Sequence, residues 1–461
     1  PMAIWWIRRD LRLTDNLALQ AALSTGGAFV PVFVLDPHLL AKPAERRQAF
    51  LFAGLRALAQ DLRALGSGLL IRSGDPVEEL PRLAQELGGL PVFAEEDASP
   101  YARERDRLVG TRANLKLLPG VGGQALGAVL KADGTPYTVF TPFSRAWKAL
   151  PPPIPLARKP LSLPTLPALA SDDLPNLPAP ANFPAGEQEA QRRLDAFLDG
   201  PIYAYKAERD RMDLEGTSAL SPYLRFGMLS ARQAAQAARG AWLSAPMESA
   251  RSGAETWLNE LIWREFYLSI LYHFPRVLTE SFVPAGKLIH WRTAPLDLAA
   301  WQSGRTGYPV VDAGMRQLAS LGWMHNRARM ITASFLVKHL LVNWQEGEAW
   351  FIRQLVDGDP ASNNGGWQWT AGTGTDAAPY FRVFNPILQG LKFDPLGAYV
   401  RRWVPELAGV PDKYIHTPWE MPAELEGAAG CRVGVDYPLP IVEHNLARER
   451  VLAVYQQAFQ R

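Results

Sequence analysis

A carboxylate, a guanidinium and two indoles recur at helical spacing in one stretch of the chain. The segment WLNELIWREFY begins at Trp257; it places Glu260 and Arg264 four residues apart, with Trp263 three residues after Glu260. On a helix, residues at this spacing are neighbours on one face. Burial of such a set without a function is unfavourable, so this face is a candidate binding or catalytic surface. Composition alone favours the alternative, a solvated ion pair on an amphipathic helix.

Two further segments combine polar groups at helical spacing. In GTSALS, which ends at Ser221, small and hydroxyl residues precede a helical pattern and could offer backbone amides and hydroxyls to a pyrophosphate. From this segment alone, a plain helix cap is the favoured alternative. In GWMHNRARM, Asn326, Arg329 and Met330 would place an amide, a guanidinium and a thioether on one helical face.

A fourth segment, DGDPASNNGGWQW from Asp357 to Trp369, is rich in turn formers. Its carboxylates, amides and glycines would allow close approach of a flat, hydrogen-bonding ligand. A structural turn explains the segment equally well.

Charge and cysteine content exclude several classes of site. With 48 basic and 46 acidic residues, the net charge of +2 does not by itself indicate nucleic-acid binding. A local basic patch is predicted between Trp301 and Gln345, where only Asp312 opposes five cations: Arg305, Arg316, Arg327, Arg329 and Lys338. The single cysteine, Cys431, excludes an internal disulfide, a thiolate zinc site and a cysteine-held iron–sulfur cluster. The histidines lack metal-type spacing, so no metal is expected.

The ends and apolar runs predict a cytoplasmic protein. Residues 2–10 do not have the pattern of a secretory signal, and no apolar run reaches the length of a membrane span. We therefore expect no membrane partner.

The elements that must position these groups fall into two halves. Before residue 120, apolar runs beginning at Ala3, Ala28, Gly68 and Pro91 alternate with amphipathic segments. This alternation predicts a doubly wound parallel sheet, Rossmann-like but without GxGxxG after the first strand. Residues 151–186 contain eleven prolines, which predicts an extended connector, with a floppy linker as the alternative. Later segments have helical periodicity. We expect an α/β domain at 1–130, a connector at 131–200 and an all-α domain at 201–461.

Together these segments carry a resemblance. The matching stretches include RRDLRLTDN at Arg8, FTPF at Phe140, EGTSALSPYLRFG at Glu215, ELIWREFY at Glu260 and WMHNRARMITASFLVK at Trp323. From Ile4 to Phe459 the sequence resembles the photolyase and cryptochrome family, most closely the class I cyclobutane pyrimidine dimer photolyases. The resemblance implies an α/β antenna domain, a connector and a helical FAD-binding domain. It also implies a lyase that uses light to transfer an electron from reduced FAD to a flipped dimer in DNA, splitting it into two pyrimidines.

The resemblance assigns residues to FAD. Those implied to hold the phosphates and ribitol are Tyr205, Thr217, Ser218, Ser221 and Arg264. Those implied to surround the adenine and isoalloxazine are Trp257, Asn326, Arg329, Asp357, Asp359 and Asn363. Asn363 is expected to face flavin N5, where an amide can donate or accept a hydrogen bond. Related sensors often vary this position, which favours repair over sensing.

The substrate side is implied by the same motifs. Glu260, Trp263, Met330 and Trp369 are expected to line the lesion pocket, with Asn363 beside the flavin as a further catalytic residue. Members of the family that are specific for the (6-4) photoproduct carry histidines at the places of Asn326 and Met330, so a cyclobutane dimer is the expected lesion. Arg209, Arg327 and Arg382 are expected to bind DNA phosphates without reading sequence.

Two further sets follow from the resemblance. Trp367, Trp344 and Trp291 match an electron-transfer triad that runs from flavin to surface. A folate antenna is not expected, because Tyr101 and Ala102 replace the Asn-Glu pair of folate-binding members. A deazaflavin or FMN chromophore is the preferred alternative, with Asp97 and Arg225 as polar contacts, and an empty pocket is a further one. We expect a monomer.

Two rival functions remain. The first is a blue-light sensor of the cryptochrome type, which often carries a long C-terminal tail that this sequence lacks after its last motif. The second is a plain electron-transfer flavoprotein, which would not explain Glu260, Trp263 and Met330 together.

Overall fold

The computed structural model describes residues 3–156, 160 and 162–460, which form two compact units. Unit 1 contains Pro1–Lys206, Ser218–Pro275 and Val356–Ala361, and unit 2 contains Ala207–Thr217, Arg276–Leu355 and Ser362–Arg461. The expected domains at 1–130, 131–200 and 201–461 are continuous segments of the sequence, whereas each compact unit is assembled from several segments. The domain bounds therefore stay a prediction. Connector positions 157–159 and 161, and the chain ends at 1–2 and 461, lie outside the described residues.

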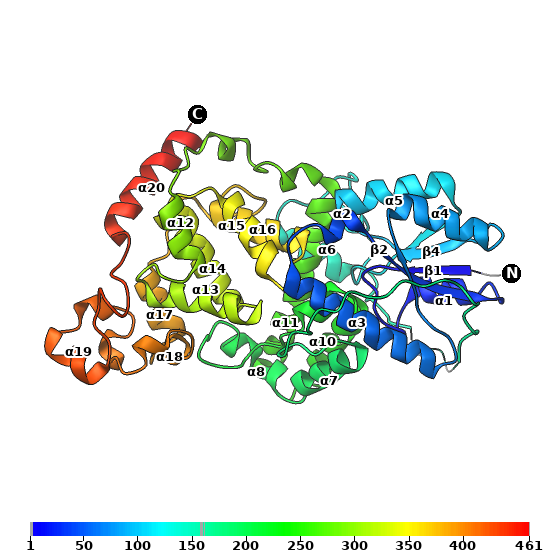
Figure 1. The fold of residues 1–461 in the computed structure, drawn as a ribbon. Helices are drawn as coiled ribbons and strands as arrows, with labels where there is room; N and C mark the ends of the chain where they lie inside the picture. The colour runs from blue at the N-terminus through cyan, green and yellow to red at the C-terminus, as the bar shows by residue number, and fades with distance from the viewer. Residues whose placement is uncertain (1–2, 157–159, 161, 461) are drawn as a thin grey trace. The chain divides into compact units, whose positions relative to one another are not determined.

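Unit 1 is built on a parallel sheet. Within the described residues its strands are β1 (Ala3–Ile7), β2 (Phe29–Leu35), β3 (Leu70–Ser73), β4 (Val92–Glu95) and β5 (Leu115–Leu118), in the order β3-β2-β1-β4-β5 (Figure 1). Ile4 of β1 aligns with Val30 of β2 and with Val92 of β4. β1, β2 and β4 are buried along their whole length, which explains their continuous apolar runs. The predicted doubly wound fold is confirmed.

Helices cover the sheet of unit 1. Figure 1 shows α4 and α5 on one side of the strands and α1 and α3 on the other. The helices of this unit are α1 (Leu17–Leu23), α2 (Pro37–Leu40), α3 (Glu45–Ala64), α4 (Pro76–Glu86), α5 (Pro100–Arg112), α6 (Phe140–Ala149), α7 (Glu187–Leu198), α8 (Pro201–Glu208), α9 (Ser221–Arg225), α10 (Ala231–Ser244) and α11 (Glu248–His273), with the last two residues of α8 in unit 2. Several starts follow capping rules; Ser230 and Gln233, for example, form a complete capping box at α10.

The described part of the proline-rich connector is tied to the sheet half. Leu163 N donates to Leu65 O over 2.8 Å, and Asp172 N donates to Ile71 O over 2.9 Å. Ile71 N in turn donates to the hydroxyl of Ser171 over 3.0 Å. These residues of the connector therefore run as an extended, docked segment, and a floppy linker does not describe them.

Unit 2 is mostly helical. Its longer elements within the described residues are α12 (Pro295–Gln302), α13 (Pro309–Leu321), α14 (Asn326–Ser334), a π-helical turn (Phe335–His339), α15 (Trp344–Gln354), α16 (Pro360–Ala371, whose first two residues belong to unit 1), α17 (Pro386–Phe393), α18 (Ala398–Trp403), α19 (Ala423–Ala429) and α20 (His444–Phe459). Short 3-10 turns lie at Pro275–Leu278, Pro284–Leu288, Pro405–Leu407, Asp412–Tyr414 and Pro418–Glu420. The observed α/β half followed by a mostly helical half confirms the expected fold class.

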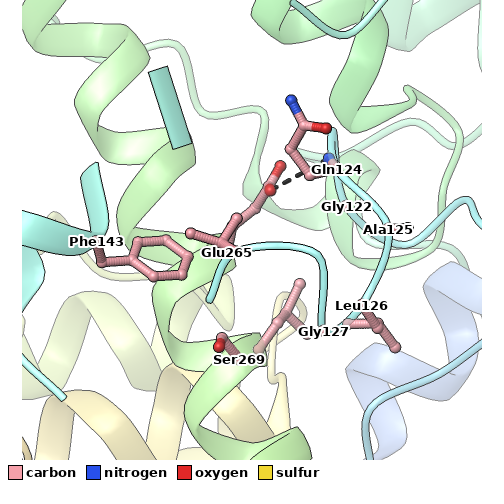
Figure 2. Close-up of a pocket in the computed structure, with 10 residues that line it drawn as sticks. Gly122, Gln124, Ala125, Leu126, Gly127, Phe143, Glu265 and Ser269 are labelled. Atoms are coloured by element: carbon pink, nitrogen blue, oxygen red, sulfur yellow. Dashed lines mark hydrogen bonds between the residues drawn. The ribbon is translucent and has the colours of Figure 1, made fainter. Parts of the chain in front are cut away.

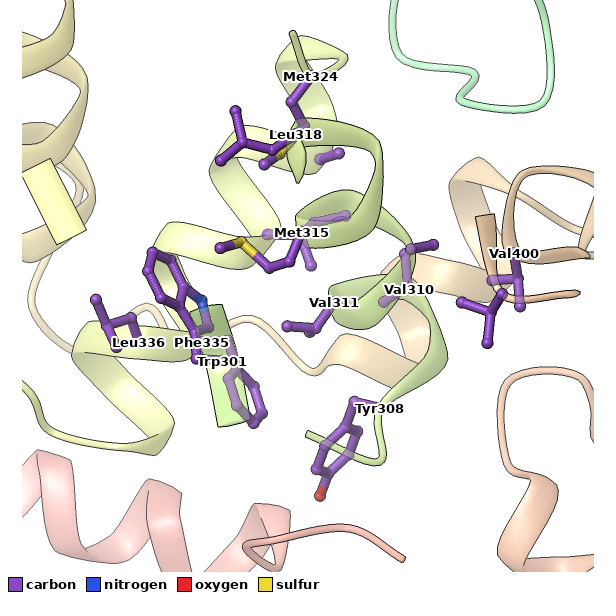
Figure 3. Packing of buried hydrophobic residues seen from close by; sticks show 14 of the residues in the cluster. Trp301, Tyr308, Val310, Val311, Met315, Leu318, Met324, Phe335, Leu336 and Val400 are labelled. Atoms are coloured by element: carbon purple, nitrogen blue, oxygen red, sulfur yellow. The ribbon is translucent and has the colours of Figure 1, made fainter. Parts of the chain in front are cut away.

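A large apolar core holds unit 2 together. Figure 3 shows Trp301, Met315 and Leu336 packed side by side within it. The indole of Trp301 is fully buried and donates to Thr332 O over 2.9 Å, so its one polar group is satisfied. Cys431 belongs to the same core and is 1% exposed. Across the described ranges, no helix has the length and apolar character needed to cross a membrane.

Candidate functional site

The helix α11 carries three consecutive residues with three different partners. Trp263 stacks on Phe140, with ring centroids 3.7 Å apart and planes 3° from parallel. Arg264 donates to Val121 O over 2.7 Å and to Leu224 O over 3.4 Å. Burial and the neighbouring Arg9 lower the pKa of Arg264. Arg264 is therefore not the solvated partner of an exposed ion pair, as the alternative interpretation of this motif required.

The third residue, Glu265, closes the loop that follows β5. Its carboxylate accepts hydrogen bonds from Gly123 N, Gln124 N and the indole Nε1 of Trp147. Burial raises the pKa of Glu265 despite these three donors. Figure 2 shows Glu265 beside Gln124 and Phe143, lining a pocket at the edge of α11. Glu265 was not predicted as a site residue, although it directly follows two residues that were, Trp263 and Arg264.

The GTSALS segment does not form a side-chain cap. The helix α9 begins at Ser221, and its N-cap residue Leu220 makes no capping hydrogen bond. Ala219, just before it, has a φ of 50°, which is rare for a residue other than glycine. Thr217 and Ser218 are half-buried. The alternative of a plain helix cap is therefore not what the structure shows, and such backbone outliers cluster at binding sites.

Unit 1 also contains the two predicted carboxylates. Asp357 accepts a hydrogen bond from the hydroxyl of Ser221 over 2.7 Å. Asp359 pairs with Arg9 over 2.7 Å and lies 3.8 Å from Arg225. Ser221 and Asp357, two predicted site residues that lie 136 positions apart in the sequence, are thus in direct contact.

The predicted antenna residues belong to the same charge cluster. Asp97 follows β4 and pairs with Arg9 over 3.2 Å. Burial would raise the pKa of Asp97, but Arg9 and Arg225 outweigh it, so the pKa lies below its usual value. Nη1 of Arg225 is buried with no hydrogen-bond partner among the described residues. The cluster lies beyond the carboxyl ends of the neighbouring strands β1 and β4, where the order of strands in the sheet reverses direction. Doubly wound sheets bind their ligands at this place.

An aromatic group connects two more predicted residues of unit 1. Phe197 lies edge-on to Tyr205, with ring centroids 5.9 Å apart, and 5.1 Å from Trp257. Tyr205 and Trp257 are both buried. Phe197 was not found from sequence.

In unit 2, α14 presents the predicted polar face. Nδ2 of Asn326 lies 3.8 Å from the sulfur of Met330, as four-residue spacing predicts. Arg329 Nε donates to Met324 O over 2.7 Å, and Arg329 is half-buried. His325 caps the helix by accepting from Arg327 N over 3.1 Å.

The helix α16 fixes the orientation of its asparagines. Asn363 Nδ2 donates to the backbone carbonyl of Glu348 over 3.0 Å. Asn364 Nδ2 donates to Glu348 Oε1 and to Val277 O, both over 2.8 Å. Burial raises the pKa of Glu348 to about 7, with Asn364 opposing the shift. Trp369, six residues after Asn363, is half-buried.

The three tryptophans of the expected triad all belong to unit 2. Trp367 and Trp344 are each 2% exposed, whereas Trp291 is half-buried. Gly347, three residues after Trp344 on α15, has no room for a side chain: a Cβ atom there would overlap the ring atoms of Trp367. Trp367 therefore packs on the face of α15 that carries Trp344. Trp291 lies edge-on to Tyr455, with centroids 6.2 Å apart.

The predicted DNA-binding arginines differ in their surroundings. Arg327 pairs with Asp210 over 2.9 Å and lies 4.4 Å above the ring of Phe393. Arg382 is exposed, and the side chain of Arg209 is 37% exposed.

The basic patch predicted between Trp301 and Gln345 is wrong in one of its members, Lys338. Lys338 is 1% exposed and donates to Tyr380 O over 3.0 Å, because the π-helical turn points it into the unit. Arg316 pairs with Glu406 over 2.7 Å. The sequence pattern missed the burial of Lys338, since a count of charges does not show which side of a helix faces inward.

No group of three or more His, Cys, Asp or Glu side chains in the described part of the chain could hold a metal ion.

Known proteins are similar to this chain along nearly its whole length. Residues 3–161 match the family model described as DNA photolyase, and residues 257–457 match the model described as FAD binding domain of DNA photolyase. The deoxyribodipyrimidine photo-lyase of Halobacterium salinarum is 41% identical over 99% of both chains.

Two solved structures are similar in fold. The structure of a bacterial class III photolyase from Agrobacterium tumefaciens has a TM-score of 0.94 and 39% identity, and covers 100% of this chain and 98% of its own. A cryptochrome from Synechocystis has a TM-score of 0.86 and 27% identity, and covers 98% of this chain and 99% of its own. With 41% identity to a full-length relative and two matching family models, the chain belongs to the DNA photolyase family.

Proposed function

We propose that this protein is a deoxyribodipyrimidine photo-lyase, a flavoprotein that repairs ultraviolet-damaged DNA by splitting cyclobutane pyrimidine dimers in light. The observation that supports this proposal most strongly is the 41% identity, over 99% of both chains, to a relative of that name. The similarity to a cryptochrome is weaker in identity, at 27%. We therefore prefer repair over sensing.

The residues present fit FAD. Arg264 donates to two neutral backbone carbonyls, so no direct carboxylate partner within the described residues neutralises its charge, which suits a phosphate. The turned backbone at Ala219 and the exposed hydroxyl residue Ser221 lie a few residues before Leu224, whose carbonyl Arg264 contacts. We assign phosphate and ribitol binding to Tyr205, Thr217, Ser218, Ser221 and Arg264. When bound, FAD supplies the light-driven electron.

Asn363 is assigned to flavin N5. Because Nδ2 of Asn363 is directed at Glu348 O, its Oδ1 is turned away from α15 and is free to accept a hydrogen bond from an N–H group. The amide orientation is thus set by the main chain of α15. We assign the remaining contacts to the flavin and adenine to Trp257, Asn326, Arg329, Asp357 and Asp359.

Glu260, Trp263, Met330 and Trp369 are assigned to the lesion. Indoles stack on flat bases, and a carboxyl group can hydrogen-bond a carbonyl on which negative charge develops. Asn326 and Met330 stand where specificity for the (6-4) photoproduct would require histidines. These features support cyclobutane dimers as the substrate.

DNA binding is assigned to Arg209, Arg327 and Arg382 through the phosphate backbone. Trp367, Trp344 and Trp291 are assigned to the delivery of electrons that reduce the cofactor before repair. The packing of Trp367 on the face of α15 that carries Trp344 supports a short first step.

Asp97 and Arg225 are assigned to an antenna chromophore, preferably a deazaflavin or FMN. The buried, unpartnered Nη1 of Arg225 supports a polar ligand at this place. Membership of class I also stays a prediction, and the similar Agrobacterium protein is described as a class III photolyase. Monomeric state and cytoplasmic location remain predictions as well.

The test is repair by the purified, reduced protein. Duplex oligonucleotides carrying one thymine dimer are illuminated, and intact thymines are measured by chromatography. We expect dimers to disappear only in light and a matched (6-4) substrate to persist. Flavin photochemistry without dimer loss would instead support the light-sensor alternative.

A further inference from the structure

The ring stack between Trp263 and Phe140 joins two elements that are far apart in sequence. Phe140 is the first residue of α6, and Trp263 lies in the middle of α11. The centroid distance of 3.7 Å at an angle of 3° is van der Waals contact over the whole ring. One face of the Trp263 indole is therefore covered by Phe140. Both residues are half-buried, so the pair lies at the surface of unit 1 rather than in its core.

Side-chain bonds hold α6 against α11 on the far side of this stack. Nε1 of Trp147 donates to the carboxylate of Glu265, and Lys148 Nζ pairs with Glu255 over 3.1 Å. Glu265 is buried, so the first of these bonds is shielded from water. The Phe140 ring is consequently presented by a helix that is fixed at its other end.

The edges of Trp263 are also occupied. Phe266 lies edge-on to the indole with centroids 5.7 Å apart, and Tyr267 lies at 5.6 Å with a tilt of 35°. Phe143, one turn after Phe140, packs edge-on to Phe266 at 5.3 Å. The plane of Trp263 is thus set by rings from both helices.

We propose that Phe140 is a positioning residue for the damaged base. It backs one face of Trp263 and so fixes the indole plane against which a flat pyrimidine stacks with the other face. The proposal rests on the assignment of Trp263 to the lesion. A half-exposed tryptophan without this backing would occupy several rotamers, and the base would have to order it on binding. Because Phe140 already orders the indole in the free protein, this loss of conformational entropy does not occur when the substrate binds.

A positioning role predicts a selective effect. Stacking on Trp263 involves only an extruded base, whereas undamaged duplex DNA is bound through its phosphates. Loss of Phe140 should therefore weaken binding of damaged DNA and leave binding of undamaged DNA unchanged. A residue that merely packs the fold would change both affinities together, or neither.

The experiment compares Phe140→Ala and Phe140→Leu with the parent protein, each carrying FAD. Dissociation constants for a thymine-dimer duplex and an undamaged duplex are measured by fluorescence anisotropy in the dark. We expect both variants to bind the dimer duplex about tenfold more weakly, with unchanged affinity for the undamaged duplex and an unchanged flavin absorption spectrum. Phe140→Leu keeps apolar packing without a flat ring, which guards against loss of α6 in the alanine variant.

Two controls sharpen the result. Phe140→Tyr retains the ring and should restore binding of the dimer duplex. Trp242→Ala removes an aromatic side chain that is 38% exposed elsewhere in unit 1 and should have no effect. Equal weakening of both duplexes, or full affinity for the dimer in both Phe140→Ala and Phe140→Leu, would overturn the proposal.

Trp263→Ala separates this inference from the proposed function. If Trp263→Ala loses dimer preference while both Phe140 variants keep it, the positioning role fails and the lesion assignment stands. If Trp263→Ala keeps full preference, the lesion assignment fails and the positioning role falls with it.

Discussion

The side-chain amide of Asn363 donates to the main-chain carbonyl of Glu348, while the carboxyl group of Glu348 accepts from the adjacent Asn364. One residue of α15 thus orients two neighbouring amides of α16. The orientation of Asn363 does not depend on the protonation of Glu348, because a backbone carbonyl holds it.

Glu348 should make stability depend on pH. Its pKa rises from 4.5 to about 7 on folding because burial disfavours the charged form. A raised carboxyl pKa contributes stability below the unfolded value of 4.5, and this contribution is lost as pH rises through about 7. Glu348→Gln should remove this loss and be more stable than the parent at pH 8, by up to about 3 kcal/mol. Denaturant unfolding between pH 5 and 8 checks this, and identical pH profiles for the two proteins would contradict it.

Gly347→Ala should impair photoreduction. The added Cβ would overlap Trp367 and lie 2.7 Å from Leu336 Cδ2, so the indole must shift away from α15. We expect slower light-driven reduction of FAD, with near-normal repair by chemically reduced enzyme. Absorption changes under illumination measure the first, and dimer loss measures the second. Gly240→Ala, at a helical glycine with open space around it, is the control. Unchanged photoreduction would show that the position of Trp367 is not critical.

Trp367→Phe should nearly abolish photoreduction with external thiol present, because only a near and easily oxidised side chain can reduce excited flavin in time. Repair by chemically reduced enzyme should stay close to normal. Trp291→Phe should slow photoreduction less completely, since the first charge separation still occurs and then recombines. Transient absorption of the tryptophan radicals distinguishes these cases. Undiminished photoreduction in Trp367→Phe would mean that another route supplies the electron.

Glu260→Ala should lower the repair yield per absorbed photon more than it lowers DNA affinity. The carboxyl group would stabilise charge that develops on the substrate only after electron transfer. Quantum yield at saturating DNA and anisotropy in the dark measure the two effects. Glu248→Ala, an 83% exposed carboxylate in the first turn of the same helix, should change neither. An unchanged yield would remove Glu260 from the mechanism.

Arg327→Ala should weaken binding of damaged and undamaged DNA alike. Asp210 and Phe393 already hold Arg327 in place, so its guanidinium needs little ordering to meet a phosphate. The salt dependence of binding should flatten by about one phosphate contact. Binding titrations at several salt concentrations check this, with the exposed Arg239→Ala as control. An effect on damaged DNA alone would make Arg327 a lesion contact.

The sequence predicted the parts of this protein that depend on local patterns. Alternating apolar runs predicted the parallel sheet, and four-residue spacing predicted the proximity of Asn326 and Met330. The burial of Lys338 could not be predicted, because it depends on a π-helical turn that shifts the facing of one residue. The two carbonyl partners of Arg264 and the stack of Phe140 on Trp263 were also missed. These contacts join residues that are 143 and 40 positions apart for Arg264, and more than a hundred positions apart for Phe140 and Trp263. The FTPF motif, which begins at Phe140, contributed to the family resemblance, but no role was predicted for Phe140.

The burial of Cys431 has a practical consequence. The thiolate is the reactive form of cysteine, and burial both hides Cys431 and raises its pKa. Maleimide dyes should therefore leave the native chain unlabelled. Because the sequence has one cysteine, a second one introduced at an exposed position would be the single point of attachment. A fluorophore placed there could report on DNA binding in single-molecule measurements without first removing any native residue.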